Sequence, residues 1–145
     1  MIRPLCSADE PQWRELWKGY LTFYETALPD EVTDATFARL QSDDPDEMRG
    51  RVAEVSGRLV GMVHYVRHRH CWRDEKVTYL QDLFALPETR GTGLGRALIE
   101  AVYREADLSG SPMVYWLTAR SNATARQLYD RIGVLTPFIE YDRPE

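Results

Sequence analysis

The stretch Leu80–Ala106, LQDLFALPETRGTGLGRALIEAVYREA, decides the fold of this chain. It begins as an apolar strand, passes through a turn with alternating glycines and continues as an amphipathic helix. Because Gly91, Gly93 and Gly95 have no Cβ, an anion can approach the main chain closely at the start of the helix. The helix dipole adds about half a positive charge at that end. The stretch therefore predicts a site for a phosphorylated ligand.

The glycine spacing excludes two common nucleotide-binding loops. A P-loop requires Lys-Ser or Lys-Thr after its last glycine, whereas Arg96-Ala97 follows here. A dinucleotide-binding turn requires G-x-G-x-x-G and a later acidic residue, whereas this loop reads G-x-G-x-G and the next strand ends in Thr118-Ala119-Arg120. The pattern that fits is R-x-x-G-x-G, from Arg90 to Gly95. From the loop alone, a glycine-rich turn without a ligand stays open.

A second block follows the turn at 109–112. Its sequence, MVYWLTARSNATARQLYDRIGV, covers Met113–Val134. It predicts a buried strand over Met113–Thr118 and then a helix that begins near Ser121 or Asn122, both good N-cap residues. Gly133 is a suitable stop for that helix.

The two blocks together resemble the GNAT N-acetyltransferase superfamily. Members carry the R-x-x-G-x-G loop and then N-x-x-A-x-x-x-Y followed by a glycine, and Asn122, Ala125, Tyr129 and Gly133 hold those positions here. The resemblance extends over nearly the whole chain and is greatest to the branch of histone/polyamine-type and diamine acetyltransferases. It implies one α/β domain over residues 1–145, with a mixed, mostly antiparallel sheet splayed at its centre and helices on both faces.

The resemblance also implies the cofactor and its contacts. In this family the loop amides bind the pyrophosphate of acetyl-CoA, the splayed strand offers its backbone to the pantetheine arm, and the tyrosine of the later helix lies beside the thioester. Carried over, the cofactor-binding residues are Leu83, Phe84, Ala85, Arg90, Gly91, Thr92, Gly93, Leu94, Gly95, Arg96, Asn122 and Tyr129. Asn122 is equally explained as a helix cap.

Acetyl transfer from a thioester to an amine has three chemical requirements. The amine must lose a proton, since a free alkylamine has a pKa of about 10.4, as lysine does. The carbonyl oxygen needs a hydrogen-bond donor, and the leaving thiolate needs a proton. Tyr129 is the candidate acid for the thiolate, with a core aromatic as the alternative. Asp82 is the second catalytic candidate, with a solvated or ion-paired strand residue as the alternative.

The amine-binding site is expected at the end of the first helix and at the splayed strand. The candidates are Tyr24, Glu25, Gln81 and Asp82. Related diamine acetyltransferases carry Glu-Asp where this chain has Gln81-Asp82, so a carboxylate base at position 81 is absent. Tyr24 also continues the apolar stripe of its helix, and Glu25 also reads as an exposed residue.

Length and composition set wider limits. The chain has 145 residues, a net charge of −5 and only two cysteines, Cys6 and Cys71. It contains neither a secretory signal nor an apolar run of ~20 residues, so we expect a cytoplasmic protein without membrane contact. The acidic balance argues against nucleic acid as a partner. His64 and His68 lie about 13 Å apart on one strand, so we expect no metal site.

The remaining pattern predicts the other elements of the domain. Strands are expected at Ile2–Leu5, Arg51–Val55, Leu59–Arg67 and Val77–Ala85, with a hairpin turn at Ser56-Gly57 and a final strand at Phe138–Tyr141. Helices are expected at Ala8–Ala27 and from Thr33 to about Gln41. RHRHCWRDEK, Arg67–Lys76, is expected to form an exposed hairpin end.

These inferences converge on an acetyl-CoA-dependent N-acetyltransferase. The expected acceptor is a primary amine on a polyamine, a small amine or amino acid, or a lysine side chain of a peptide, which attacks directly in a ternary complex. The resemblance implies a homodimer. Two alternatives stay open: a protein acetyltransferase that docks a macromolecule, and a non-catalytic module that senses acyl-CoA.

Overall fold

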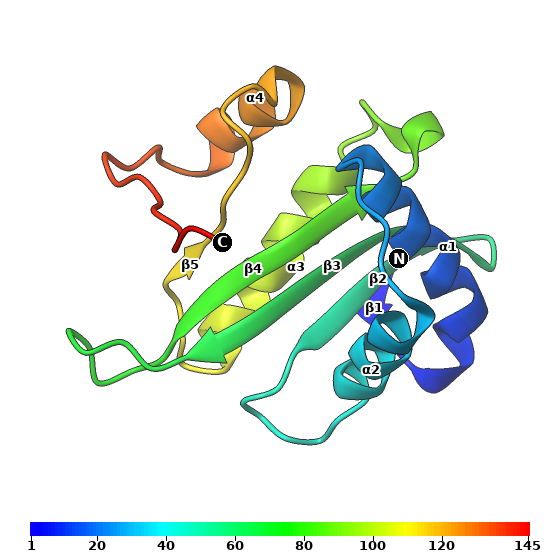
Figure 1. Ribbon diagram of the computed structural model, residues 1–145, viewed down its shortest axis with the longest axis horizontal. Helices are drawn as coiled ribbons and strands as arrows, with labels where there is room; N and C mark the ends of the chain where they lie inside the picture. The colour runs from blue at the N-terminus through cyan, green and yellow to red at the C-terminus, as the bar shows by residue number, and fades with distance from the viewer.

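A five-stranded sheet forms the centre of the computed structural model, which describes residues 1–145 (Figure 1). Its strands lie in chain order: β1 (Ile2–Pro4), β2 (Arg49–Val55), β3 (Arg58–His68), β4 (Val77–Ala85) and β5 (Val114–Tyr115). The first four pair antiparallel, and β5 pairs parallel to β4. This is the mixed, mostly antiparallel sheet that the sequence predicts.

Helices cover both faces of the sheet (Figure 1). The helices α1 (Glu10–Phe23) and α2 (Asp30–Leu40) pack on one face, where Trp13, Leu16 and Phe37 join Met62 and Phe84 of the sheet in one apolar cluster. The helix α3 (Leu94–Leu108) packs on the other face and forms a second cluster through residues that include Leu98, Ile99 and Val102. The helix α4 (Ala123–Ile132) adds partly buried side chains to the second cluster. Two short 3-10 turns, Ser7–Asp9 and Pro87–Thr89, precede α1 and the glycine loop.

The predicted hairpins form for the expected reasons. Ser56 and Gly57 both adopt positive φ angles, 50° and 79°, as the tight turn between β2 and β3 requires. The β3–β4 connection is exposed, with the Trp72 side chain 88% accessible. Strand β4 has the predicted bounds.

Three predicted boundaries differ from the structure by three residues or more, and the others by one or two. The first helix ends at Phe23 rather than Ala27, and α2 begins at Asp30 rather than Thr33 because Pro29 stands at its N-cap instead of ending the helix before it. Strand β5 is only Val114–Tyr115, not Met113–Thr118. The main chain leaves β4 after two residue pairs, so the remaining residues have no strand to bond.

The predicted final strand, Phe138–Tyr141, is also absent. Residues 134–141 make no backbone hydrogen bond within the chain. Val134, Phe138 and Tyr141 are each more than 80% exposed. A strand needs a neighbour to satisfy its N–H and C=O groups, and within one chain this segment has none.

No helix of the structure is both long enough and apolar enough to cross a membrane.

Candidate active site

The glycine loop presents bare backbone donors in front of α3. Gly91 and Gly93 have φ angles of +80° and +85°, in the left-handed region that favours glycine, and Gly93 is the N-cap of α3. The backbone N–H groups of Gly91, Gly93, Leu94, Gly95 and Arg96 donate no hydrogen bond to the backbone of the chain. A Cβ built at Gly91 or Gly93 meets nothing within 4 Å, so the space above the loop is open. The loop therefore has the geometry of an anion site.

The two cations of the loop point elsewhere. The Arg90 guanidinium lies 5.6 Å from the centre of the Phe23 ring, over the end of α1. Arg96 forms an ion pair with Glu100 one turn further along α3, at 2.7 Å. The main chain rather than these side chains supplies the free donors.

Next to the loop, the outer edge of β4 is unpaired. Only Thr78 and Tyr79 pair with β5, so the stretch from Leu80 to Ala85 has no neighbour on that side (Figure 1). The predicted splay is therefore present, between β4 and the last strand of the sheet. The side chain of Phe84 packs in the core against Gly19 of α1, so position 84 can offer only its main chain to a ligand.

A β-bulge interrupts β4 at Gln81. Its neighbour Asp82 pairs with His64 and Leu80 pairs with Tyr65, which leaves Gln81 as the extra residue. Gln81 is exposed. The bulge places Asp82 on the α1 face of the sheet, with Phe84.

Asp82 is a buried carboxylate held by a histidine. Its side chain is 8% exposed, and its Oδ2 lies 2.9 Å from Nδ1 of His64, which is 1% exposed. The opposite ring nitrogen of His64, Nε2, accepts a hydrogen bond of 3.0 Å from the Trp13 indole N–H. The solvated interpretation of Asp82 is thus wrong, and Asp82 is part of a buried polar network.

Tyrosines of α1 and β4 surround the free side of Asp82. Burial and the Asp82 carboxylate together raise the pKa of Tyr20 and of Tyr24, so both hydroxyls stay protonated at neutral pH. The two rings contact each other at 5.0 Å between centroids. On β4, burial and the charges of Tyr115, Asp82 and Glu140 raise the pKa of Tyr79. These rings form an aromatic wall around a single negative charge.

Tyr129 faces this wall from α4. Burial, with a contribution from the Tyr24 hydroxyl, raises the pKa of Tyr129 to about 12. Its ring packs edge-on against Trp116, with centroids 5.5 Å apart. The Tyr129 hydroxyl makes no hydrogen bond within the chain, although the Tyr129 ring contacts the α3-side cluster. The predicted apolar packing and a free phenol are both present.

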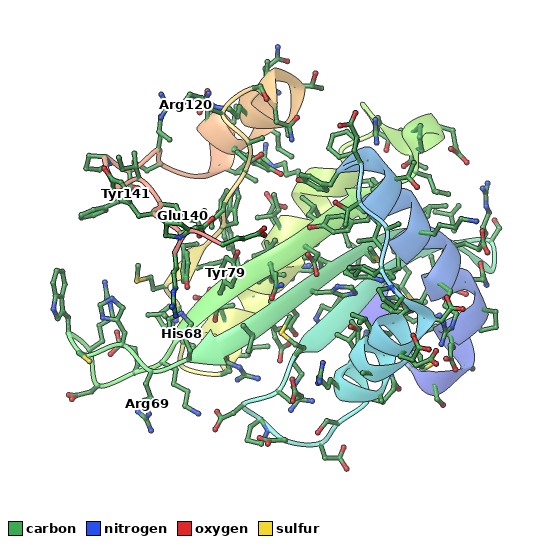
Figure 2. The ribbon with its side chains drawn as sticks, viewed as in Figure 1. His68, Arg69, Tyr79, Arg120, Glu140 and Tyr141 are labelled. Atoms are coloured by element: carbon green, nitrogen blue, oxygen red, sulfur yellow. The ribbon has the colours of Figure 1, made fainter.

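The C-terminal segment approaches the same region. Figure 2 shows Glu140 and Tyr141 on the segment that folds back toward β4, on which Tyr79 lies. The negative charge of Glu140 is close enough to affect Tyr79. Below them His68 donates to or accepts from the Tyr115 hydroxyl at 2.7 Å.

The other predicted site residues lie outside this cluster or act differently. Glu25 is exposed, with a left-handed φ of 53°, and its side chain makes no hydrogen bond or ion pair within the chain. Asn122 stands at the N-cap of α4 but makes no capping hydrogen bond with its side chain, which bonds Thr118 at 3.3 Å instead. The predicted N-cap position of Asn122 is therefore confirmed, but its side chain does not supply the capping hydrogen bond. Gly133 ends α4 in an extended conformation, and glycine is needed because a Cβ there would lie 2.8 Å from the Trp116 ring.

Sequence reasoning missed Trp13, Tyr20 and His64. Trp13 and Tyr20 follow the helical spacing of a core-facing stripe, which hides their polar atoms among apolar neighbours. For His64, the spacing to His68 argues against a metal site but predicts neither its burial nor its hydrogen-bond partners. A detectable signal was its place in an otherwise apolar strand, since a buried imidazole needs hydrogen-bond partners on neighbouring elements.

Known proteins are similar to this chain in sequence. The model of the acetyltransferase (GNAT) family matches residues 11–134. A D-amino-acid N-acetyltransferase of Saccharomyces cerevisiae is 37% identical over 99% of this chain and 89% of its own length. An uncharacterized N-acetyltransferase of Bacillus subtilis is 27% identical over 97% of this chain and 94% of its own.

Solved structures share the fold at lower identity. An aminoglycoside acetyltransferase, AAC(6′)-Iy, in complex with a CoA bisubstrate analogue superposes with a TM-score of 0.84 at 22% identity, over 100% of this chain and 97% of that one. A ribosomal-protein-alanine N-acetyltransferase from Brucella melitensis superposes at 0.80 and 20% identity, over 100% and 98%. The family match covers the first helix, the glycine loop and α4 together. The chain therefore belongs to the acetyltransferase (GNAT) family and is an N-acetyltransferase.

Proposed function

We propose that this enzyme transfers the acetyl group of acetyl-CoA to a primary amine by direct attack in a ternary complex. The observation that carries the proposal is the buried Asp82 carboxylate, enclosed by Tyr20 and Tyr24 and faced by Tyr129 beside the unpaired edge of β4. A carboxylate in an aromatic enclosure selects a cation, and a primary ammonium is the cation that becomes a nucleophile when it loses a proton.

The residues of the glycine loop and of β4 fit acetyl-CoA. The open N–H groups of Gly91 and of residues 93–96 suit a pyrophosphate, and the free edge from Leu83 to Ala85 suits the amides of a pantetheine arm. Asn122 and Tyr129 lie on the α4 side of the same opening. When bound, acetyl-CoA supplies an activated acyl carbonyl. No metal is invoked.

Asp82 is proposed to bind the amine and to favour its deprotonation. The acceptor arrives as an ammonium, and the carboxylate attracts it among low-polarity rings. The proton leaves to solvent or through water to Asp82, and the nitrogen lone pair then attacks the acyl carbon. Gln81 and Tyr24 line the approach, and exposed Glu25 is proposed only as an outer contact.

Tyr129 is proposed as the acid for the leaving sulfur. As the carbon–nitrogen bond forms, the carbon–sulfur bond breaks, and the phenol proton goes to the thiolate. The extra proton on the new amide nitrogen leaves to water, and the Tyr129 phenolate regains a proton from water. A backbone N–H of the unpaired stretch at Leu83–Ala85 is the proposed donor to the carbonyl oxygen. The raised pKa of Tyr129 keeps the proton in place at neutral pH.

The acceptor class is proposed to be small. The yeast relative is named as a D-amino-acid N-acetyltransferase, which favours a free amino acid among polyamines, small amines and peptide lysines. A peptide acetyltransferase and a non-catalytic acyl-CoA sensor are the competing functions.

Free, exposed Cys6 and Cys71 agree with a reducing compartment such as the cytoplasm.

An amine panel tests the proposal. The purified protein is incubated with acetyl-CoA and, separately, spermidine, D-alanine, L-lysine and a lysine-containing peptide, and products are identified by mass spectrometry. We expect an N-acetylated small amine and stoichiometric free CoA thiol. Acetylation of the peptide alone would select the protein acetyltransferase, and binding of CoA without any product would select the sensor.

A glycine substitution tests the cofactor loop with a matched control. Gly93→Ala and Gly57→Ala both force a left-handed φ on alanine in open space, so each should cost a similar ~1–2 kcal/mol of stability. Only Gly93→Ala places a methyl over the anion site. By isothermal titration calorimetry we expect at least about tenfold weaker CoA binding for Gly93→Ala and wild-type affinity for Gly57→Ala. Equal affinities in the two variants would remove the loop from the cofactor site.

Tyr129→Phe tests the acid. We expect kcat to fall by about 10²-fold, within the usual range for a general acid, while the Kd for CoA stays unchanged. Because the reactive form is the protonated phenol and its pKa is about 12, Tyr129 should cause no loss of kcat between pH 7 and pH 10. A wild-type kcat in the variant, or a basic limb in that range that the substitution abolishes, would contradict the assignment.

The homodimer is also proposed, and the C-terminal segment supports it. Val134, Leu135, Phe138, Ile139 and Tyr141 are each 66% or more exposed, and their main chain has no partner within the chain. A second copy can cover such a segment reciprocally, because a two-fold interface uses the same surface on both subunits.

Analytical ultracentrifugation checks the assembly. We expect a dimer for the wild type and a monomer for the double variant Phe138→Asp/Ile139→Lys. Trp72→Asp changes an equally exposed aromatic on the β3–β4 connection and should leave the dimer intact. A monomeric wild type at about 50 μM, well above the Kd of ordinary specific interfaces, would refute the proposal.

A further inference from the structure

The buried imidazole of His64 carries a polar network that no sequence motif predicts. It lies on β3, 1% exposed, with Trp13 and Trp17 of α1 packed over it at ring distances of 5.9 and 5.6 Å. A buried imidazole in an apolar core is destabilising unless both ring nitrogens are hydrogen-bonded. Both are bonded here, to partners on two different elements.

The two partners determine which nitrogen of His64 carries the proton. The indole of Trp13 is only a donor, so Nε2 of His64 must accept and is unprotonated. In the neutral ring the proton then resides on Nδ1 and is donated to Oδ2 of Asp82 at 2.9 Å. Trp13 therefore fixes the tautomer, and the tautomer holds one oxygen of Asp82.

The two oxygens of the Asp82 carboxylate therefore have different surroundings. Oδ2 is fixed by a donor from the core side, His64. Away from His64, the Tyr20 hydroxyl is within hydrogen-bond reach of the same carboxylate. Tyr20 and Tyr24 lie near enough for the Asp82 charge to affect their hydroxyls. His64 and Asp82 are also a directly opposed residue pair across β3 and β4, beside the bulge at Gln81. The sheet itself therefore fixes the distance between them.

We propose that His64 is a positioning residue for the amine acceptor: its Nδ1–H holds the Asp82 carboxylate in one rotamer, with the other oxygen directed to the incoming ammonium. The inference rests on the proposed function, in which Asp82 binds the amine. His64 itself touches neither substrate and takes no proton during the reaction.

The test combines kinetics with a conservative rescue. His64→Leu removes both ring nitrogens, whereas His64→Asn keeps an N–H donor near the position of Nδ1. Rates are measured with whichever of spermidine, D-alanine and L-lysine is turned over fastest, and the Kd for CoA is measured by calorimetry. For His64→Leu we expect kcat/KM for the amine to fall about tenfold to a hundredfold, the range for a lost hydrogen bond to a charged group, with an unchanged Kd for CoA. His64→Asn should recover most of the loss.

Asp82→Asn and the double variant His64→Leu/Asp82→Asn separate the role of His64 from the role of Asp82. If His64 acts through Asp82, His64→Leu should add little further loss in the Asp82→Asn background. Suppose that Asp82→Asn lowers kcat/KM as the proposed function requires. The His64 inference is then overturned by any of three results: kcat/KM losses that multiply in the double variant, equal losses in His64→Leu and His64→Asn, or a wild-type kcat/KM in His64→Leu. A wild-type rate in Asp82→Asn would overturn the role of Asp82 in the proposed function, and the His64 inference with it.

A second variant keeps the test decisive if His64→Leu does not fold. Trp13→Phe preserves the aromatic packing and removes only the donor to Nε2, which releases the tautomer. We expect a smaller loss of amine kcat/KM in the same direction, and again an unchanged Kd for CoA. An unchanged kcat/KM in a folded Trp13→Phe protein overturns the inference.

Discussion

The departure of β5 from β4 is the constraint on which the site depends. A parallel pair normally continues along the whole strand, because each further residue adds hydrogen bonds to the ladder. Here the pairing ends after Tyr79 and Tyr115, and the rest of β4 keeps an open edge in the middle of the fold. The opening is maintained from both sides, since Trp116 and α4 pack on the α3-side cluster while α1 packs on the opposite face. An unpaired edge that the core holds open is a binding surface made of main chain.

The same opening explains why a carboxylate is buried at Asp82. A charged group removed from water is strongly destabilising unless hydrogen bonds replace its hydration. The β-bulge at Gln81 and the opposed position of His64 supply one such bond within the sheet, between β3 and β4. In the proposed function, the remaining hydrogen-bonding capacity of the carboxylate serves the incoming ammonium. Under that proposal, stability and amine recognition are linked at Asp82, and the imidazole that satisfies Asp82 also orients it.

The parts of the fold that follow from local chemistry were predictable from the sequence. The alternating glycines before α3 and the Ser56-Gly57 turn have strict conformational requirements, and both regions have the expected form. The bounds of β4 follow from its apolar run and the charged segment before it. The Asp82–His64–Trp13 network was not predictable, because it joins residues of three elements and depends on a bulge that shifts the register by one residue. The prediction of a final strand was wrong for a related reason. Phe138–Tyr141 has the composition of a strand, but composition does not show whether the same chain provides a neighbouring strand for it.

The two halves of the site are built from different materials, and this difference has consequences for specificity. The proposed cofactor half consists of backbone N–H groups and an open strand edge, which tolerate many side-chain changes as long as the glycines remain. The proposed acceptor half consists of side chains from α1 and β4, with Glu140 of the C-terminal segment nearby (Figure 2). A change in acceptor therefore needs only new side chains on α1 or on the C-terminal segment, whereas a change in cofactor needs a new main-chain path. Asp82 lies beneath that aromatic wall and is tied to the sheet through His64. The proposed function therefore assigns to Asp82 the feature that all primary amines share, the ammonium, and to the residues around it what distinguishes one amine from another.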